Sequence, residues 1–487
     1  MRQSPKGFRW AKFHTGFAVL ISIAVISFYH VVLNADSAGI SSANLSLPKL
    51  VDTQRAVENV DNKSLVSELV PKDSNDDESP NQVEGPVQVH TEFQNLGYQD
   101  PREEPTNEKQ AFKTPFGQII WKELAPQIYA SSDGALMANY RGFKLKLTLN
   151  KDLQESTKKN FDAQRNVAGA TVIIESRTGK ILALSERKSE IANPLVSDDT
   201  IAIAAKAPAA SLMKIITATA AIEKTGMDPD DEIAFRGGCG HLRNQNWIRD
   251  SATDRQKLTL AKAFGNSCNT AFARVALYWT GLSTLRQYAE KYMFNKPIPS
   301  DLRMETSAAL MPQLETASAL EVGEAGAGFG ATKLTPIHAA LLSATAGNGG
   351  IMMAPYLVEA AFDQSGKQVY TAAPREISRV FSKKTSEKLF RCMQETILTG
   401  TSRKFFRRRG TARDRFEIGG KTGTLSDAEE RATLYTWFSG VAPLDSPHNV
   451  AIGTLIASPK NWVVRASSVA QTSLARFLML EKQRDVE

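Results

Sequence analysis

One short stretch of the sequence, residues 207–226, pairs a serine with a lysine at a spacing suited to acyl transfer. It reads APAASLMKIITATAAIEKTG, and Ser211-Leu-Met-Lys214 is a Ser-x-x-Lys pattern at the start of an apolar helix. Three residues of spacing put the two side chains on one helix face. The free N–H groups and positive dipole end of a helix N-terminus favour a developing anion. A lysine held against a serine in a water-poor site can act as general base, so Ser211 is a candidate nucleophile and Lys214 its candidate base.

A Lys-Thr-Gly pattern occurs twice, and the two copies predict different things. The copy at 224–226 ends the helix that starts at Ser211, with Gly226 where a C′ glycine belongs, so we interpret it as a helix stop. The copy in EIGGKTGTLS follows a predicted strand and a Gly-Gly step. Such a strand at an open sheet edge can bind a peptide as an added strand, and its ammonium and hydroxyl groups can bind a carboxylate. The candidate binding residues there are Lys421, Thr422, Gly423 and Thr424.

A third pattern, Ser267-Cys-Asn269, lies between these two. Ser267 could pass protons and Asn269 could hold a substrate amide, but both could also belong to an N-cap for a helix that starts near Thr270. Each pattern is weak alone. For Ser211 and Lys214, the plain alternative is a surface lysine that follows a helix-capping serine. Residues 156–159 also fit Ser-x-x-Lys, and residues 42–44 fit Ser-x-Asn.

Composition limits the classes of protein that fit. The 487 residues are 42% hydrophobic and 23% charged, which is typical of a globular protein with a core. The net charge of +7 is uneven, because basic residues cluster at the N-terminus and in 403–415, while 51–110 hold 14 acidic and 5 basic side chains. No continuous basic face is indicated, which argues against a nucleic-acid-binding protein.

The three cysteines are Cys239, Cys268 and Cys392, and no Cys-x-x-Cys occurs, so a structural zinc site or a redox dithiol is not expected. One disulfide with one free thiol fits an exported chain, and the sequence leaves the pairing open. The unusual segment 238–250 has one Cys and one His, which favours a local fold element over a metal site. The basic run 403–409 predicts a solvated loop, with contact to an anionic envelope polymer as the alternative.

The N-terminus predicts a membrane-anchored, exported protein. Residues 16–33 are apolar and long enough to span a hydrocarbon core as a helix. The cytoplasmic tail, 1–15, carries the basic residues that orient such a signal anchor, namely Arg2, Lys6, Arg9 and Lys12. A cleaved signal peptide is the alternative, but no clean Ala-x-Ala site follows. The polar, acidic tract 34–111 predicts a flexible tether, because it cannot bury enough apolar surface to fold.

Behind a lead-in segment at 112–141, the folded domain is expected at 142–481. Alternation and turn signals predict strands at 143–150, 169–176, 180–186, 415–420, 432–442 and 449–458. Helices are expected at 151–164, through most of the chain to about 345, and at 465–481, and Thr335-Pro336 is a good helix start. Early strands, a helical middle and late strands predict an α/β (α+β) domain whose sheet is built from both ends of the chain.

Taken in order, Ser211-x-x-Lys214, Ser267-x-Asn269 and Lys421-Thr422-Gly423-Thr424 resemble the motif triple of the penicillin-recognising serine enzymes. Flanking segments add to the likeness, including ATVIIESRTGKILALSE, KLTPIHAALLSATAGNGGIMMAPYLVEA and YTWFSGVAP. The resemblance covers about 142–481 and is to the transpeptidase domain of membrane-anchored, monofunctional penicillin-binding proteins. It implies a β-lactamase/transpeptidase-like fold, a mainly antiparallel sheet flanked by helices with an all-helical subdomain, and no metal or cofactor.

The resemblance also implies a role for each motif residue. Ser211 would be acylated, Lys214 would be its base, and Ser267 would relay a proton to the leaving amine. Asn269 would bind the donor amide, Lys421 and Thr422 would polarise the site, and Thr424 would hold the terminal carboxylate beside Gly423. The backbone N–H groups of Ser211 and Thr424 would form the oxyanion hole.

The implied substrate is a D-Ala-D-Ala stem peptide, cross-linked to an acceptor amine of peptidoglycan outside the cytoplasmic membrane of a bacterium, with β-lactam antibiotics as covalent ligands. Glycosyltransferases and divisome or elongasome proteins are candidate partners, because no glycosyltransferase domain fits between anchor and domain. The alternatives are a D,D-carboxypeptidase or β-lactamase, and, as a non-enzyme, a β-lactam sensor or a stem-peptide-binding scaffold. No glutamate can be assigned to the deacylating role that class A β-lactamases need.

Overall fold

The computed structural model describes residues 113–163, 167–189, 200–242, 245–249, 252, 254–407, 417–426, 433–443, 446, 448–459 and 464–484. These all belong to one unit, Gly97–Glu487. The predicted tail, anchor and tether (1–111) lie outside the described residues. Among the helices that the structure describes, none is long and apolar enough to cross a membrane.

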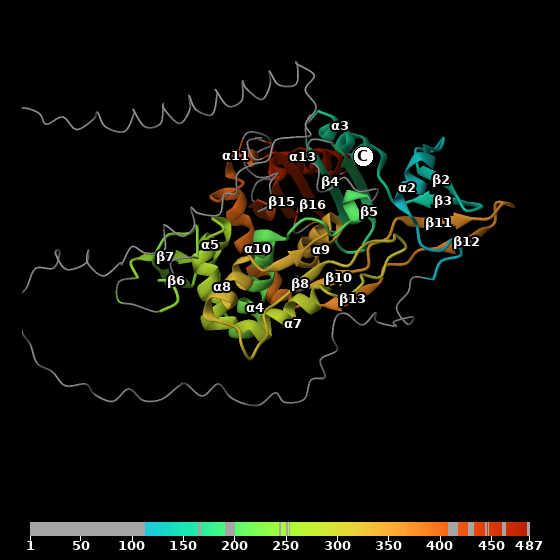
Figure 1. Cartoon of the computed structure of the whole chain (residues 1–487). Coiled ribbons are helices and arrows are strands. Elements are labelled where there is room, and N and C mark those ends of the chain that lie inside the picture. The colour runs from blue at the N-terminus through green and yellow to red at the C-terminus, as the bar shows by residue number, and fades with distance from the viewer. Residues whose placement is uncertain are drawn as a thin grey trace, which may run out of the picture. The chain divides into compact units, whose positions relative to one another are not determined.

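An antiparallel sheet of five strands is built from both ends of the chain, as predicted (Figure 1). Its strands, in spatial order, are β14 (Gly419–Ser426), β15 (Thr433–Ala442), β16 (Val450–Pro459), β4 (Ala168–Glu175) and β5 (Ile181–Arg187). The β4–β5 hairpin confirms the turn predicted at 177–179. Of the strand predicted at 415–420, residues 415 and 416 lie outside the described residues, and β14 begins at Gly419. The Lys-Thr-Gly-Thr motif therefore lies inside β14 instead of following a strand. Because β14 is the last strand in this order, no strand of the described part of the chain pairs with its outer edge.

Helices cover both faces of this sheet because its strands are apolar on both sides. Along β16, Ile452 and Ile456 pack in the cluster with α3 (Lys151–Asp162) and α13 (Ala466–Arg484), whereas Leu455 faces the larger core on the other side. That side is covered by α9 (Pro336–Gly347), whose N-cap Thr335 accepts from the His338 amide at 3.1 Å, as the Thr-Pro pattern predicts. Figure 1 shows α3 and α13 on one side of the sheet and α9 on the other.

A second five-stranded sheet includes the segment expected only as a lead-in. Its order is β1 (Ile128–Ala130), β2 (Leu136–Tyr140), β3 (Phe143–Leu147), β11 (Val358–Phe362) and β12 (Gln368–Thr371), and α2 (Trp121–Leu124) lies beside it. The buried Asp301 carboxylate accepts from the backbone N–H groups of Leu357 and Val358 at the start of β11, and burial raises its pKa to about 6. A short pair, β10 (Ile351–Met353) and β13 (Glu376–Arg379), follows α9.

The middle of the chain is mainly helical, but it is not all helical as expected. Its helices are α4 (Met213–Thr225), α5 (Leu260–Gly265), α6 (Asn269–Arg274), α7 (Gly281–Lys291) and α8 (Ala319–Ala327), with a π-helical stretch at Val275–Thr280. Two small antiparallel pairs interrupt them, β6 (Glu232–Phe235) with β7 (Gln256–Thr259), and β8 (Ala308–Leu310) with β9 (Ala331–Lys333). In both places the chain returns antiparallel to an earlier segment, and the two segments pair as strands. Helical periodicity alone does not predict such pairing.

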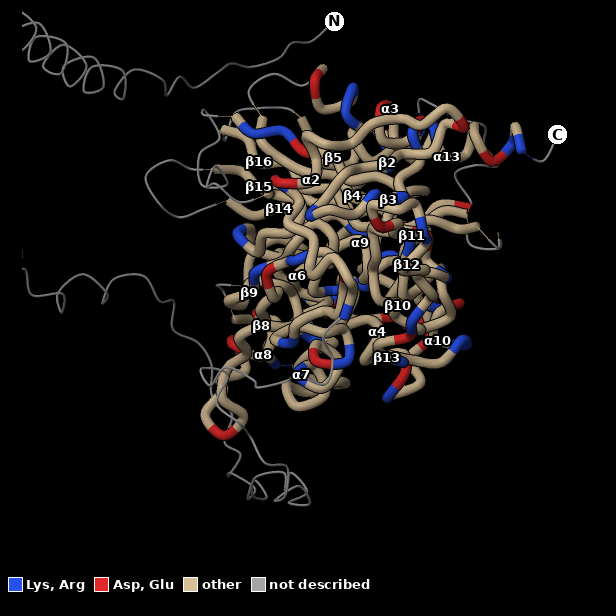
Figure 2. The backbone as a smooth tube through the Cα atoms, turned by 90° about the vertical axis from the view of Figure 1, so that its right-hand side faces the viewer, with Lys and Arg blue, Asp and Glu red and all other residues tan. Residues whose placement is uncertain are grey.

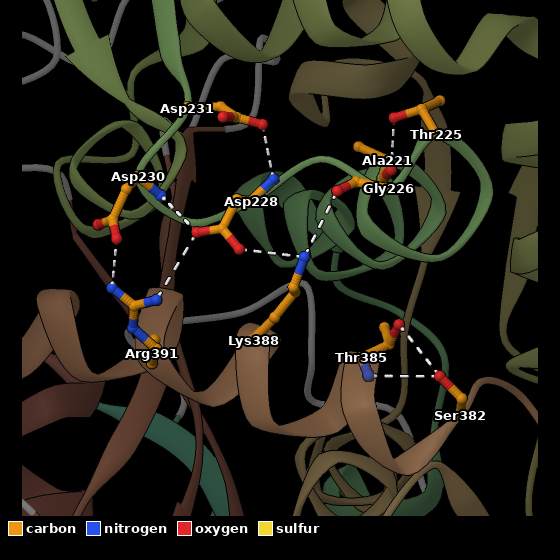
Figure 3. Close-up of polar contacts among 10 residues, drawn as sticks. All are labelled: Ala221, Thr225, Gly226, Asp228, Asp230, Asp231, Ser382, Thr385, Lys388 and Arg391. Carbon is orange, nitrogen blue, oxygen red and sulfur yellow. Dashed lines mark hydrogen bonds and ion pairs between the residues drawn. The ribbon is translucent and has the colours of Figure 1, made fainter.

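The first Lys-Thr-Gly copy is a helix stop, as predicted. Gly226 ends α4 with a left-handed backbone (φ 74°), and its carbonyl accepts from Lys388 Nζ at 3.4 Å (Figure 3). Lys388 belongs to α10 (Lys383–Leu398), which also reaches the loop after α4 through Lys388–Asp228 at 3.1 Å and Arg391–Asp230 at 2.8 Å. These contacts fasten the far end of α4 to α10.

The basic run at 403–409 begins as a helix, α11 (Arg403–Phe406), and not as the predicted solvated loop. The reason is that Phe406 is buried and packs on Phe438 of β15, with ring centroids 5.5 Å apart. Residues 408 and 409 lie outside the described part. Elsewhere, basic and acidic residues are interspersed along the described backbone (Figure 2).

Candidate active site

Ser211 and Lys214 meet at the start of α4. Ser211 lies in a 3₁₀ turn, Ala210–Leu212, one turn earlier than the α-helix itself, and Lys214 lies in the first α-helical turn. Lys214 Nζ is 2.8 Å from Ser211 Oγ and also donates to Asn269 Oδ1 at 2.7 Å and to the Ala327 carbonyl at 2.5 Å. The predicted spacing therefore places the amine beside the hydroxyl, in a side chain that is completely buried.

The electrostatics of Lys214 favour the neutral amine. Burial is the larger cause that brings its pKa well below the usual range, because the charged form loses its hydration. The nearby charge of Lys421 lowers the pKa further. A neutral Lys214 has a lone pair that can accept the Ser211 proton, which a charged ammonium cannot do.

The backbone before the nucleophile is held in an uncommon conformation. Ala210 has φ 50°, in the left-handed region that costs a non-glycine residue free energy. Gly328, just after α8, packs on it so closely that a Cβ there would lie 2.2 Å from the Ala210 carbonyl oxygen and 3.2 Å from the Ser211 nitrogen. Gly328 has φ 95°, so both space and backbone angle require glycine. The contact fixes the turn that presents Ser211.

Lys421 of β14 reaches the Ser-x-Asn segment. Its Nζ donates to Ser267 Oγ at 2.9 Å and to the Thr422 carbonyl at 2.9 Å, and the side chain is fully buried. Burial lowers its pKa to about 7. The two lysines thus each contact a serine hydroxyl, Lys214 at Ser211 and Lys421 at Ser267.

Asn269 and Ser267 do not cap a helix, contrary to the alternative drawn from their sequence. Cys268 is the N-cap of α6 and no side chain makes a capping hydrogen bond there. Instead, the Asn269 side chain bridges, since Oδ1 accepts from Lys214 and Nδ2 donates to the Gly240 carbonyl at 2.6 Å. Ser267 has φ 56°, which turns the chain at this point. Both side chains are therefore directed to site lysines.

A disulfide joins Cys239 to Cys268, the middle residue of Ser-x-Asn, and leaves Cys392 as a buried thiol. Two further hydrogen bonds lie beside the disulfide. The backbone N–H of Asn269 donates to the Cys239 carbonyl at 3.0 Å, and Thr270 Oγ1 donates to the Gly238 carbonyl at 2.6 Å. The segment that the sequence marked as unusual is therefore the support of the motif. Among the described residues, no group of three His, Cys, Asp or Glu side chains could hold a metal ion.

The remaining residues of the second Lys-Thr-Gly copy line the open edge of the sheet. Thr422 is half-buried and its Oγ1 lies 2.7 Å from Thr401 Oγ1, while Thr424 is exposed two residues further along β14. A Cβ at Gly423 would lie 3.2 Å from Trp437 Cβ and 3.3 Å from the Ala209 carbonyl oxygen, so glycine lets β14 approach the turn before Ser211. The motif therefore runs past the nucleophile with an exposed hydroxyl, on the last strand of the described sheet.

Three contributors were missed in the sequence: the carbonyls of Ala327 and Gly240 and the hydroxyl of Thr401. A backbone carbonyl has no residue signature, and a threonine is too common to single out.

A cavity of about 870 Å³ beside β2 and β3, lined in part by Tyr140, Lys144 and Asp363, includes no motif residue. The chemistry that this arrangement supports is activation of a serine hydroxyl by a buried amine, with a second amine and hydroxyls to bind a carboxylate.

Comparison with known proteins gives the same family as the motifs. Residues 169–479 match the penicillin binding protein transpeptidase domain. The chain is 27% identical over 348 residues to peptidoglycan D,D-transpeptidase PbpA of Mycobacterium tuberculosis. The aligned region covers 65% of this chain and 67% of that protein.

Two solved structures share the fold. One is the D,D-transpeptidase domain of a peptidoglycan glycosyltransferase from Eggerthella lenta, with 24% identity, a TM-score of 0.58, and coverage of 76% of this chain and 92% of that one. The other is the imipenem acyl-enzyme complex of penicillin-binding protein A from M. tuberculosis, with 24% identity, a TM-score of 0.55, and coverage of 69% and 79%. With the domain match spanning well over half of its length, the chain belongs to the penicillin-binding protein transpeptidase family, the serine acyl-transferases that cross-link peptidoglycan.

Proposed function

We propose that this chain is a peptidoglycan D,D-transpeptidase that is acylated at Ser211 by a D-Ala-D-Ala stem peptide and passes the acyl group to an acceptor amine. The observation that carries the proposal is the 2.8 Å contact between Lys214 Nζ and Ser211 Oγ. The Lys214 side chain that makes this contact is fully buried. The similarity to a peptidoglycan D,D-transpeptidase of M. tuberculosis supports the same reaction.

In the first step, neutral Lys214 takes the Ser211 proton while Oγ bonds to the carbonyl carbon of the penultimate D-Ala. The backbone N–H groups of Ser211 and Thr424 stabilise the oxyanion, and losing one such donor typically costs about 10²–10³ in rate. The C–N bond then breaks, and Ser267 delivers its hydroxyl proton to the leaving D-Ala amine while it takes a proton from the Lys421 ammonium that donates to it. An acceptor amine reverses these steps on the acyl-serine.

Substrate binding uses the free edge of β14 and the groups around it. The donor peptide adds as a strand beside Gly423, with its amide at Asn269. Its terminal carboxylate lies at Thr424, where the charge of Lys421 and the hydroxyl of Thr422 polarise the site. The exposed Thr424 supports this placement, as does the outer edge of β14, with which none of the described strands pairs.

We also propose that the enzyme is held on the outer side of the bacterial cytoplasmic membrane by a single signal anchor at 16–33 and a tether at 34–111. The Cys239–Cys268 disulfide supports an exported catalytic domain, because disulfides persist in oxidising compartments. Stem peptides and β-lactams are its ligands. Glycosyltransferase, divisome or elongasome partners remain candidates from the sequence.

The first prediction concerns the acyl-enzyme. Incubated with penicillin, the purified chain should gain the intact mass of one penicillin on Ser211. Ser211→Ala should abolish this adduct and Lys214→Ala should nearly abolish it, whereas Ser156→Ala, in the other Ser-x-x-Lys pattern, should leave it unchanged. Intact mass spectrometry with peptide mapping makes the measurement.

Other outcomes separate the alternatives. Rapid penicillin turnover without an adduct would indicate a β-lactamase. If the chain forms no adduct and turns over no penicillin, it is not an enzyme of this class. Because a sensor would also acylate, a donor stem peptide must be offered with an acceptor amine. A cross-linked product supports the transpeptidase, and hydrolysis of the terminal D-Ala alone indicates a carboxypeptidase.

A second prediction concerns pH. The rate constant for acylation should rise with pH as Lys214 loses its proton, at a pH well below the usual lysine pKa. It should fall again above about 7, as Lys421 loses the charge that binds the substrate carboxylate. Lys421→Arg should remove or shift the falling limb because arginine stays charged, and Lys224→Ala should keep the wild-type profile. A rate that climbs steadily to pH 10 in the wild type would contradict these assignments.

A third prediction concerns the disulfide. Cys239→Ser should slow acylation by about 10-fold, because it frees the segment whose Gly240 carbonyl orients Asn269, and small misplacements in a site are costly. Reducing agent should have the same effect on the wild type. Cys392→Ala is the control, since this buried thiol is not in the bridge. Unchanged acylation after reduction would mean that the segment holds its place without the bridge.

A further inference from the structure

We infer that Thr401 is a positioning residue that holds the Lys-Thr-Gly strand in register with the segment that carries Ser267. The inference rests on the proposed function and concerns a residue outside the three motifs. Thr401 lies in the short connection between α10 and α11, and its Oγ1 is 2.7 Å from Thr422 Oγ1 on β14.

Thr401 also binds the end of α5, two residues before Ser267. Its backbone N–H donates to the Gly265 carbonyl at 3.0 Å, and its hydroxyl lies 3.4 Å from the same oxygen. The preceding Gly400 is pressed against this carbonyl, because a Cβ there would lie only 2.1 Å from the Gly265 oxygen. The backbone at Gly400 therefore packs directly on the backbone at Gly265. From this contact the Thr401 hydroxyl reaches Thr422.

These contacts close a ring around the second lysine. Gly265 accepts from Thr401, Thr401 meets Thr422, and the Thr422 carbonyl accepts from Lys421, which in turn donates to Ser267. Ser267 returns to Gly265 through two peptide links. If the Thr401 hydroxyl is lost, its backbone bond to Gly265 stays, but the link to Thr422 is gone. Of the contacts in the ring that reach β14, only those of Lys421 then remain.

Thr401 is itself held on both sides. On the N-terminal side, α10 is fastened to α4 by Lys388 and Arg391 (Figure 3). On the C-terminal side, the buried Ser402 hydroxyl lies 2.8 Å from Ser467 Oγ of α13. The backbone N–H of Ser402 donates to the Thr396 carbonyl at 3.0 Å. A hydroxyl placed this firmly can fix Thr422, whereas a mobile one could not.

The test compares Thr401→Val with Thr401→Ser and with the control Thr399→Val in the full chain. Valine keeps the shape but loses the hydroxyl, so the second-order rate constant for acylation by a fluorescent penicillin should fall about 5- to 10-fold. Serine keeps the hydroxyl and should stay within about twofold of the wild type. Thr399 bonds the Glu395 carboxylate at the end of α10, so its valine variant should be unchanged. Equal melting temperatures would separate positioning from a loss of folding.

A double-mutant cycle with Thr422→Val distinguishes positioning through Thr422 from a general structural effect. We expect Thr401→Val to add almost nothing in a chain that already carries Thr422→Val, because the contact is then absent. Multiplied losses, or a wild-type rate in Thr401→Val, would overturn the inference. If valine lowers the melting temperature, Thr401→Ala takes its place in the same cycle. Failure of the wild type to acylate would instead overturn the proposed function.

Discussion

The burial of two lysine side chains in one site is the constraint on which the rest of the structure depends. Lys214 and Lys421 are both inaccessible to solvent, and removing a charged amine from water is costly unless it is paired or neutral. Within the described part of the chain, the two amines bond to hydroxyls, an amide oxygen and backbone carbonyls, and none of these partners is a carboxylate. The protein thus supplies hydrogen-bond acceptors without an opposite charge. Burial lowers the pKa of both amines, and the charge of Lys421 lowers that of Lys214 further.

The fold serves this constraint by bringing together elements that are far apart in the chain. Lys214 comes from the start of α4, and Lys421 comes from the edge of a sheet that begins with β4 and closes with the C-terminal strands. Gly328 and Gly423 allow two backbones to approach the Ser211 turn closely. A Cβ would collide with the Ala210 carbonyl at Gly328 and would be tightly crowded at Gly423. The disulfide and α10 then support the Ser-x-Asn segment and the β14 strand from outside.

Much of this could be predicted from local sequence, and the failures have a common cause. Periodicity, caps and turn residues predicted the helix stop at Gly226, the helix start at Thr335 and the central sheet, because those signals are local. The motif residues were identifiable because their types carry the chemistry. The Ala327 carbonyl, the choice of Cys239 and Cys268, the role of Thr401 and the pairing of β3 with β11 all depend on contacts between distant segments. No pattern within one segment records such contacts.

The protonation state of Lys214 tests the account most directly. The measurement is an NMR titration of the chain with ¹³C at lysine Cε, with the two site lysines assigned by Lys214→Arg and Lys421→Arg. We predict two resonances that titrate well below the other lysines, and a Lys214 pKa that rises in a Lys421→Met chain, where the neighbouring charge is gone. If Lys214 titrates with the surface lysines near about 10.4, it is charged at neutral pH and cannot be the base for Ser211.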